Sequence, residues 1–581
     1  FQYSADKQLS AGTITSFVEA QDGQGLFSVS DFSIPVATFL EWVSNNDNDA
    51  ALSLILKGAD SKSGSDQGDY LIGLDGNDTI SAGAGADVVE GGQGDDLIFA
   101  EGGDDLIFGG SGNDWIDAGS GVEEVYGGDG NDTFHMSVAN NGGLNSYYDG
   151  GEGIDTLDFS AITSNLRLFS DQEVGNRFQI NDNIVLNVER LIAGSGNDLL
   201  DFRYLSGGIE VDAAGGNDTL RGTSSNDRLY GGSGTDTLLL TGSAANYLVR
   251  ADGNGWRIAT ATDVDFVRDV EQVSIGGADI SWDKFVAQAA SGLRYIASNP
   301  DLIRVLGANS DAGFQHYVDW GRAEGRATTS FDPLLYAASN TDLARVLGVN
   351  QAALTEHYIK YGSAEGRATQ SFKPLEYGAS NLDVMRALGA DAAALTDHYV
   401  RYGVGEGRAT ASFDTMRYAA SNPDLLRALG ADETALASHY IRYGFAEGRA
   451  TASFDALLYG ASNVDLARVL GPNPAALTEH YVKYGFAEGR ATTSFDWKLY
   501  AASNLDLARA LGSNEQAVIS HYITYGLGEG RATSGFDAVA YMINNADLGR
   551  AGLTTTTVVQ HWLSDGAREG RVTSGAFGGE Q

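Results

Sequence analysis

The 581-residue chain contains no cysteine, so disulfides cannot stabilise it and zinc sites built on thiolates are excluded. It has only 7 prolines against 76 glycines, a balance that suggests repeat architecture. No run of about 18 apolar residues is present, so the sequence predicts no transmembrane segment. The chain opens at Phe1 without a basic region followed by an apolar one. We therefore expect it to be trimmed, or to be exported without an N-terminal signal peptide.

Positive charge is also scarce, and its shortage is uneven. The chain has 37 Lys or Arg against 78 Asp or Glu, and residues 1–289 hold 13 of the former against 47 of the latter. A basic surface is needed to bind nucleic acid, so nucleic-acid partners are excluded. Such a concentration of like charge predicts that the N-terminal half is expanded or disordered unless a cation neutralises it.

A nine-residue pattern, Gly-Gly-x-Gly-x-Asp-x-hydrophobic-x, occupies residues 64–136 in eight registered copies, and broken copies follow to residue 239. The clearest copies are GGQGDDLIF, GGSGNDWID and GGDGNDTFH, beginning at Gly91, Gly109 and Gly127. Glycine permits a tight turn whose carbonyl groups point at a cation, and aspartate adds an anionic oxygen. Ca²⁺ takes roughly six to eight oxygen ligands, so one ion should bridge two turns. The predicted metal ligands are the acidic positions of these copies: Asp69, Asp78, Asp87, Asp96, Asp105, Asp114, Glu123, Asp132, Asp155, Asp198, Asp218, Asp227 and Asp236.

These nonapeptides resemble the RTX (hemolysin-type) calcium-binding repeats of secreted bacterial proteins. The resemblance implies a right-handed parallel β-roll whose turns alternate between two edges, so that Asp69 stacks on Asp87 and Asp78 on Asp96. Eight turns would then offer up to six bridging Ca²⁺ sites. It also implies type I secretion from a Gram-negative bacterium. A glycine-rich disordered linker is the alternative, but it does not explain why the hydrophobic position is filled in all eight copies.

The C-terminal half contains a different repeat, of 41 residues, in which seven histidines and seven tyrosines recur from Tyr295 to His561. One copy reads SFDPLLYAASNTDLARVLGVNQAALTEHYIKYGSAEGRAT. We predict three helices in each copy, with Pro333 opening the first, a capping box at residues 339–342, and helix ends at Gly348 and Gly362. Spacings of three, four and seven residues place Leu354, His357, Tyr358 and Tyr361 on one face of the third helix. The fold class is therefore a parallel β-roll followed by an all-α array of seven helical repeats.

The predicted domains are an N-terminal β/α cap (1–63) with a helix over residues 35–43, a first roll block (64–136), a β excursion (137–192), a second block (193–239), a β-rich cap (240–289) and the helical array (290–581). In the array the regularly spaced histidines favour packing against a neighbour's backbone over metal or haem ligation. The Glu-Gly-Arg motif of each copy favours an ion pair that ties one copy to the next over an anion site. The tyrosines and Trp320 favour core packing over stacking on sugars.

The sequence contains no zinc-protease motif, nucleophile elbow, phosphate-binding loop or thiol nucleophile, so we expect no enzyme. The favoured function is a secreted structural protein that folds on Ca²⁺ and assembles with copies of itself, of the S-layer or adhesin type. The alternative is a calcium-stabilised binding module whose helical array recognises a polysaccharide, a lipopolysaccharide or a protein.

Overall fold

The computed structural model describes residues 13–21, 24–35, 57–136, 146–170, 177–180 and 183–573. These residues form two compact units, one within 1–332 together with 355–367, the other within 333–354 together with 368–581. The helix predicted over residues 35–43 lies outside the described residues, except that Pro35 ends a strand. No described helix is both long and apolar enough for a membrane span.

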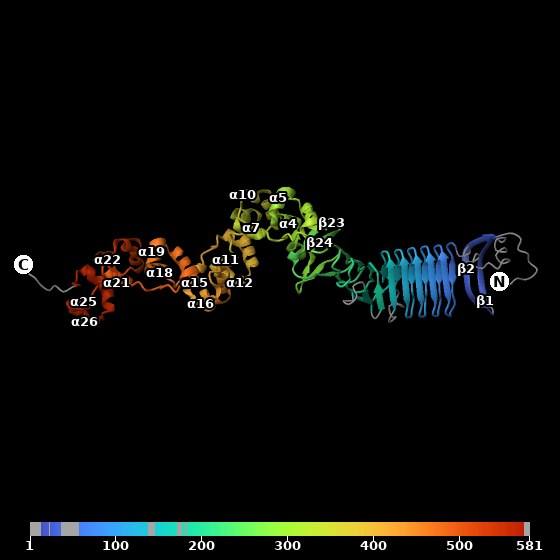
Figure 1. Cartoon of the computed structure of the whole chain (residues 1–581), viewed down its shortest axis with the longest axis horizontal. Helices are drawn as coiled ribbons and strands as arrows, with labels where there is room; N and C mark the ends of the chain where they lie inside the picture. Colours follow the sequence, from blue (N-terminus) through green and yellow to red (C-terminus); the bar gives the residue numbers. More distant parts are fainter. Residues whose placement is uncertain are drawn as a thin grey trace, which may run out of the picture. The chain divides into compact units, whose positions relative to one another are not determined.

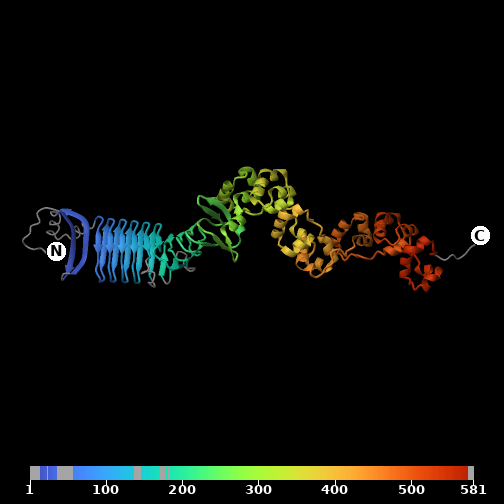
Figure 2. The same cartoon turned by 180° about the vertical axis from the view of Figure 1, so that it is seen from behind.

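The nonapeptides wind into a β-solenoid of about 8 turns over residues 61–238, as predicted, and its short strands stack at regular intervals (Figures 1 and 2). Consecutive strands alternate between two sheets, and each pairs in parallel with the strand one coil away. The strands of the first sheet in the roll are β3 (Ser61–Ser63), β5 (Thr79–Ser81), β7 (Leu97–Phe99), β9 (Trp115–Asp117), β11 (Thr133–His135), β13 (Thr156–Asp158), β17 (Arg190–Ile192), β19 (Glu210–Asp212) and β21 (Arg228–Tyr230). Those of the second are β4 (Tyr70–Asp75), β6 (Val88–Gln93), β8 (Leu106–Ser111), β10 (Glu124–Asp129), β12 (Tyr147–Glu152), β18 (Leu199–Asp201), β20 (Thr219–Arg221) and β22 (Thr237–Leu239).

The hydrophobic position of each nonapeptide points between the two sheets. Ile80, Val89, Ile98, Ile107 and Val125 have no measurable solvent exposure. Their side chains form a narrow core because a three-residue strand turns its single central side chain inward. One buried residue per strand is little apolar area, so the roll needs a further source of stability.

Strands of other kinds extend the roll at three places. At its start, β1 (Thr13–Gln21) and β2 (Gln24–Pro35) pair antiparallel, and β2 pairs with β3. Between the two blocks, β14 (Arg167–Ser170), β15 (Arg177–Ile180) and β16 (Asn183–Leu186) form an antiparallel set within the second sheet. Beyond the second block lie η2 (Ala244–Asn246), β23 (Leu248–Asp252), β24 (Gly255–Ala259), β25 (Val264–Arg268), β26 (Gln272–Ile275), β27 (Ala278–Ser281), α3 (Trp282–Gln288) and β28 (Ala290–Ser291).

Seven three-helix repeats follow, as the 41-residue period predicts. The first comprises α4 (Gly292–Ser298), α5 (Pro300–Leu306), α6 (Ser310–His316) and the π-helical turn η3 (Tyr317–Gly321). The second comprises α7 (Pro333–Ser339), α8 (Thr341–Leu347), α9 (Gln351–His357), η4 (Tyr358–Gly362) and α10 (Ser363–Glu365), and the third α11 (Pro374–Ser380), α12 (Leu382–Leu388), α13 (Ala392–His398), η5 (Tyr399–Gly403) and α14 (Val404–Glu406). The fourth comprises α15 (Thr415–Ser421), α16 (Pro423–Leu429), α17 (Glu433–His439) and η6 (Tyr440–Gly444), and the fifth α18 (Ala456–Ser462), α19 (Val464–Leu470), α20 (Pro474–His480) and η7 (Tyr481–Gly485). The sixth comprises α21 (Trp497–Ala502), α22 (Leu505–Ala510), α23 (Glu515–His521), η8 (Tyr522–Gly526) and α24 (Leu527–Glu529), and the seventh α25 (Ala538–Asn544), α26 (Ala546–Arg550), α27 (Thr557–His561), η9 (Trp562–Gly566) and α28 (Ala567–Glu569).

The π-helical turn changes two details of the predicted third helix. Gly362 has φ within the right-handed helical region and lies inside the helix, and Gly366, at φ 66°, ends it instead. The extra residue in the turn also rotates the following side chains, so Tyr361 is 56% exposed while Leu354 is fully buried. Leu354 and Tyr361 therefore do not share one face of the helix, and that prediction was wrong.

The capping box predicted at residues 339–342 does not form. Ser339 ends α7, and its Oγ accepts the backbone N–H of Phe372, 3.1 Å away, from the next repeat. The same bond joins later repeats, as between Ser421 Oγ and the N–H of Phe454. This serine therefore links consecutive repeats, and α8 starts after Asn340 without a side-chain cap.

Candidate calcium site of the roll

Acidic residues stack in two ladders, one along each edge of the roll. Through most of the first block, the backbone N–H of an acidic residue donates to a carboxylate oxygen of the acidic residue one coil further on. On one edge, Asp78 donates to Asp96 at 2.7 Å and Asp96 to Asp114 at 2.8 Å. On the other, Asp69 donates to Asp87 at 2.6 Å. The first block contains six such pairs: 69 with 87, 78 with 96, 87 with 105, 96 with 114, 105 with 123, and 114 with 132.

The second oxygen of nearly every ladder carboxylate is buried without a hydrogen-bond donor among the described residues. This holds for eleven of the thirteen predicted ligands: Asp78, Asp87, Asp96, Asp105, Asp114, Glu123, Asp132, Asp155, Asp198, Asp218 and Asp236. Leaving a buried charged oxygen unsatisfied is costly, because it has lost its water without gaining a partner. A cation is the partner that would remove this cost.

Glycines shape the space into which these oxygens point. A Cβ placed on Gly91 would lie within 2.5 Å of both Asp96 Oδ2 and the carbonyl oxygen of Gly109 in the next coil. The equivalent position on Gly109 is within 2.5 Å of Asp114 Oδ2 and the Gly127 carbonyl oxygen. The carboxylate oxygen of one coil and the carbonyl oxygen of the next therefore converge beside each glycine, as oxygen ligands shared by one Ca²⁺ must. A side chain at the glycine would fill this cradle.

Asp69 and Asp227 differ from the other predicted ligands. The Oδ2 of Asp69 accepts the N–H and the hydroxyl of Ser65, at 2.6 and 2.9 Å. The carboxylate of Asp227 accepts the N–H and hydroxyl of Thr223 in the same way. A hydroxyl residue four positions before the aspartate, where other copies often carry glycine, thus satisfies the oxygen that a metal would use. These two sites are the least suited of the thirteen to a cation.

The ladders continue through residues that the nonapeptide pattern does not identify. Glu123 donates its N–H to Ser146 Oγ, and Ser146 donates to Asn183 Oδ1, so neutral groups take the acidic position there. Asp155 and Asp236 donate to the carboxylates of Glu189 and Glu271. The nine-residue period does not predict these two glutamates, because they lie 34 and 35 residues from the aspartates that they contact. The signal in the sequence is instead the Val-Glu pair that recurs at 188–189 and 270–271.

Burial raises the pKa of Asp96, Asp114 and Glu123 above the ordinary value, and the charge of neighbouring carboxylates raises it further. The pKa of Asp96 rises to about 6, that of Asp114 to about 7 and that of Glu123 to about 8. The donated backbone N–H groups act in the opposite direction and are outweighed. In the metal-free ladder Glu123 therefore holds a proton at neutral pH and Asp114 is about half protonated, and a bound cation would displace these protons.

Lys62 supplies a cation at the first coil. It occupies the inward position of β3, opposite Ile80 of β5, and is 4% exposed. Its Nζ donates to the carbonyl oxygens of Ile72 and Gly73, the latter at 2.9 Å. Burial lowers its pKa, whereas Asp78, Asp60 and Asp96 raise it. An ammonium group is thus buried at the first coil, near the first carboxylates of the ladder.

The donor set fits Ca²⁺. All donors are carboxylate or backbone carbonyl oxygens, and the described residues contain no group of three acidic or histidine side chains that would form a metal cluster alone. Carbonyl oxygens from two coils must therefore complete the coordination, which suits the large, flexible shell of Ca²⁺ better than the octahedral shell of Mg²⁺. Bound Ca²⁺ would supply positive charge to both carboxylates of a pair and so hold adjacent coils together.

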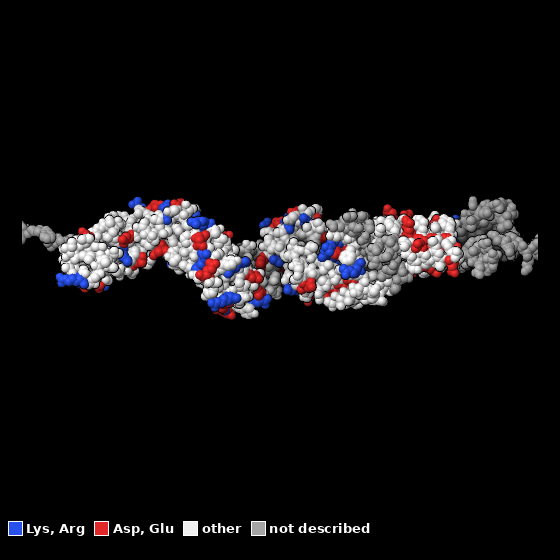
Figure 3. Space-filling view, turned by 90° about the horizontal axis from the view of Figure 1, so that it is seen from below, with Lys and Arg blue, Asp and Glu red and all other residues white. Residues whose placement is uncertain are grey.

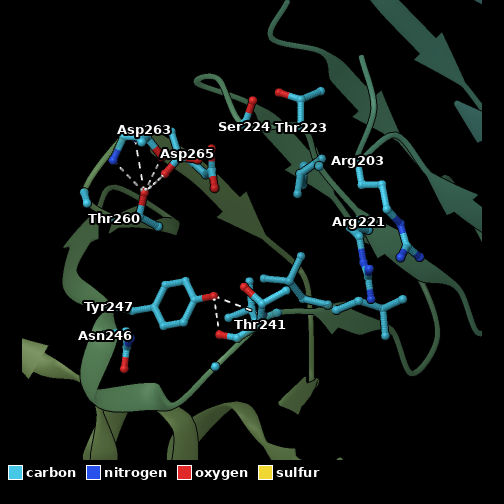
Figure 4. A pocket seen from close by; sticks show the side chains of 18 residues that line it. Arg203, Arg221, Thr223, Ser224, Thr241, Asn246, Tyr247, Thr260, Asp263 and Asp265 are labelled. Atoms are coloured by element: carbon cyan, nitrogen blue, oxygen red, sulfur yellow. Dashed lines mark hydrogen bonds between the residues drawn. The ribbon is translucent and has the colours of Figure 1, made fainter. Parts of the chain in front are cut away.

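A pocket of about 570 Å³ lies where the second block meets the following β-hairpins (Figure 4). Arg203 and Arg221 line one side and Asp263 and Asp265 the other. Two of its polar side chains are hydrogen-bonded, since Asp265 accepts the N–H of Asp227 at 3.0 Å and the Tyr247 hydroxyl bonds the backbone of Thr241, whereas the Nε of Arg221 has no hydrogen-bond partner among the described residues. Burial raises the pKa of Asp265 to about 8, so this end of the ladder holds a proton at neutral pH.

In the helical array, the candidate histidines and arginines have structural partners. The buried Tyr418 hydroxyl hydrogen-bonds to His439 Nδ1 at 3.0 Å, and the same pair recurs in other repeats, for example Tyr377 with His398. The predicted backbone partner of the histidine was thus wrong. Arg449 pairs with Glu447 at 2.6 Å and with Asp424 at 2.5 Å, both in its own repeat. The ion pair closes a repeat onto itself and does not tie one repeat to the next.

The tyrosines of the array form three sets, and the one that directly follows the histidines, such as Tyr399 and Tyr440, is buried or half-buried. Tyr418 and its equivalents are fully buried, as core packing predicts. A third set, one aromatic per repeat, is more than half exposed: Trp320, Tyr361, Tyr402, Tyr443, Tyr484 and Tyr525. Each tyrosine of the set lies against the histidine four residues earlier, with ring centroids 5.5 Å apart for Tyr402 and His398. The last repeat has exposed Asp565 at this position.

Edge ladders with buried oxygen cradles define a calcium-binding β-roll. The model of the RTX calcium-binding nonapeptide repeat (4 copies) matches residues 63–98, 99–134 and 212–242. The chain therefore carries RTX calcium-binding repeats, as the sequence predicted, and they lie in the solenoid. No curated protein matches the chain.

Proposed function

We propose that this protein is a secreted structural component that folds when Ca²⁺ enters the roll and then assembles with copies of itself at the cell surface or in the extracellular matrix. The observation that carries the proposal is the set of buried carboxylate oxygens without donors along both edges. Such ladders favour an unfolded chain where Ca²⁺ is scarce and a folded one outside the cell. RTX repeat proteins are typically secreted by bacteria, which supports an extracellular, Gram-negative setting.

Self-assembly is supported by the construction of both regions as repeats with long side faces. Carboxylates lie on the outer surface of the roll with few basic groups among them (Figure 3). Ca²⁺ could bridge such faces of adjacent copies. We further propose that the protein is not an enzyme, since its sequence contains no zinc-protease motif, nucleophile elbow, phosphate-binding loop or thiol nucleophile.

Electron microscopy and light scattering of the full chain, with Ca²⁺ and with chelator, test the assembly. We expect sheets, filaments or large particles with Ca²⁺ and their dispersal by chelator. A variant with Asp96→Asn and Asp114→Asn serves as a control for folding of the roll. Monodisperse, calcium-folded monomers at all protein concentrations would contradict self-assembly.

The exposed aromatic series favours a second candidate, a binding module for polysaccharide or lipopolysaccharide. Aromatic faces stack on sugar rings, and a basic residue precedes several of the tyrosines, as Arg401 precedes Tyr402. The triple variant Tyr402→Ala, Tyr443→Ala, Tyr484→Ala should abolish retention on a polysaccharide column and leave the helical circular dichroism unchanged. Equal retention of the variant would exclude these side chains from glycan binding.

A further inference from the structure

Two short segments outside the nonapeptides have the same sequence pattern and the same backbone conformation. Residues 187–189 read Asn-Val-Glu and residues 269–271 read Asp-Val-Glu. Asn187 has φ 51° and Asp269 has φ 53°, in the left-handed region that asparagine and aspartate tolerate better than most residues. Each segment accepts a hydrogen bond from an earlier residue of the ladders, Asp155 in one case and Asp236 in the other.

The left-handed residue of each segment brings a carbonyl oxygen into a glycine cradle. A Cβ on Gly150 would lie within 2.5 Å of both the Asn187 carbonyl oxygen and Asp155 Oδ2. A Cβ on Gly231 would lie within 2.8 Å of the Asp269 carbonyl oxygen and Asp236 Oδ2. This repeats the arrangement at Gly91, with the carbonyl supplied by the Asn-Val-Glu or Asp-Val-Glu segment in place of a nonapeptide glycine.

The carboxylates at both places match those of the regular coils. Asp155 and Asp236 are fully buried, and the Oδ2 of each has no hydrogen-bond donor among the described residues. Glu189 Oε2 accepts the N–H of Asp155 at 3.0 Å, and Glu271 Oε2 accepts that of Asp236 at 2.9 Å. The glutamate thus takes the place that the next aspartate holds elsewhere, and its charge adds to that of the buried carboxyl.

We propose that each of these segments completes a further Ca²⁺ site, one formed by Asp155, Glu189 and the Asn187 carbonyl, the other by Asp236, Glu271 and the Asp269 carbonyl. Both three-residue segments lie outside the residues that the repeat model matches, although Asp236 itself lies within the match to residues 212–242. The inference rests on the proposed calcium-dependent folding and extends it to residues of another sequence pattern. The longer side chain of glutamate lets a segment with a different path along the chain still reach the preceding coil.

Counting bound Ca²⁺ tests these two sites. Full-length protein with Glu189→Gln, with Glu271→Gln and without substitution is dialysed against a calcium buffer, and the bound metal is measured by atomic emission. Glutamine keeps an oxygen that can accept the aspartate N–H and removes only the charge. We expect each variant to bind one Ca²⁺ fewer than the unsubstituted protein, and to need a several-fold higher Ca²⁺ concentration for half-maximal folding by circular dichroism.

Glu210→Gln is the matched control, because Glu210 lies on β19 beside Arg190 and Arg228 and outside both cradles. It should bind the full number of ions. If all variants bound the same number of ions as the unsubstituted protein, the two proposed sites would be overturned and the nonapeptide sites would not. If the control also lost an ion, the loss would be an effect of total charge, and the proposal would again be overturned. If the unsubstituted protein bound no Ca²⁺, the proposed function would fail with it. If the Glu189→Gln variant does not fold, the ion count of Glu271→Gln still tests the proposal, because Glu271 is exposed and its substitution should not prevent folding.

Discussion

The roll and the helical array both contain many acidic residues, but they compensate this charge in opposite ways. In the array, Arg449 holds Glu447 and Asp424 of its own repeat, and the same three-residue cluster recurs from repeat to repeat. In the roll, Asp96 and Asp114 are stacked and buried, and among the described residues neither forms a salt bridge with a basic side chain; Figure 3 shows the contrast at the surface. The array therefore carries its own counter-charge, whereas the roll must take it from solution.

Removing Ca²⁺ should have the largest effect and should separate the two regions. With chelator we expect the roll, residues 61–238, to lose nearly all hydrogen-exchange protection, because stacked carboxylates then repel without compensation. Residues 368–573 should keep theirs, since their ion pairs are internal. Protection measured by mass spectrometry in both conditions checks this. An unchanged roll, or simultaneous loss in the array, would contradict the contrast.

Removing one pair of ligands should produce the next largest effect. Asp96→Asn with Asp114→Asn keeps oxygen acceptors for the backbone N–H groups but deletes two charges from one shared site. We expect the Ca²⁺ concentration at half-maximal folding to rise at least about tenfold, as for other disrupted metal sites. Asp69→Asn is the matched control, because Ser65 already occupies the oxygen of Asp69 that would face a metal. An equal shift in this control would mean that ladder charge matters and cradle geometry does not.

Acidification should partly replace Ca²⁺ in the roll. The pKa values of Asp114 and Glu123 are raised to about 7 and about 8, so the folded, metal-free roll binds more protons than the unfolded chain. Its stability therefore falls as pH rises through this window and is regained as pH falls. In chelator, β-structure measured by circular dichroism should increase from pH 8 to pH 5, while the Ca²⁺ midpoint rises because protons compete for the same oxygens. Loss of apo structure on acidification would contradict the pKa directions.

The regular repeats allowed the fold to be predicted from the sequence. Features that depend on local backbone geometry or on contacts outside the repeat period could not be predicted. The nine-residue period predicted that Asp78 stacks on Asp96. It also predicted that Ile80 and Ile98 face inward, because in a short strand the apolar side chain fixes which face of the strand points to the core. The period could not identify Glu189, which lies outside it and reaches Asp155 only through the fold.

The π-helical turn of the array could not be predicted either. Helical periodicity assumes 3.6 residues per turn, and one added residue moved Tyr361 to the surface and Gly362 into the helix. Gly444 suggests a signal for such a turn, since a Cβ there would meet the hydroxyl of Tyr418. This glycine is needed because the tyrosine hydroxyl packs against the helix backbone, so here glycine indicates close packing within a helix and not the end of one.

The smallest effect should come from the array's own ion pairs. Arg449→Met removes the partner of both Glu447 and Asp424, yet these groups lie at the surface, where water and salt replace most of the lost attraction. We expect a small fall in the melting temperature of the array that is the same with Ca²⁺ and with chelator. Arg442→Met, at an exposed arginine of the same repeat for which the described structure shows no acidic partner, is the control and should change it less. A calcium-dependent shift from Arg449→Met would show that the array also depends on the ion, and the contrast between the two regions would no longer hold.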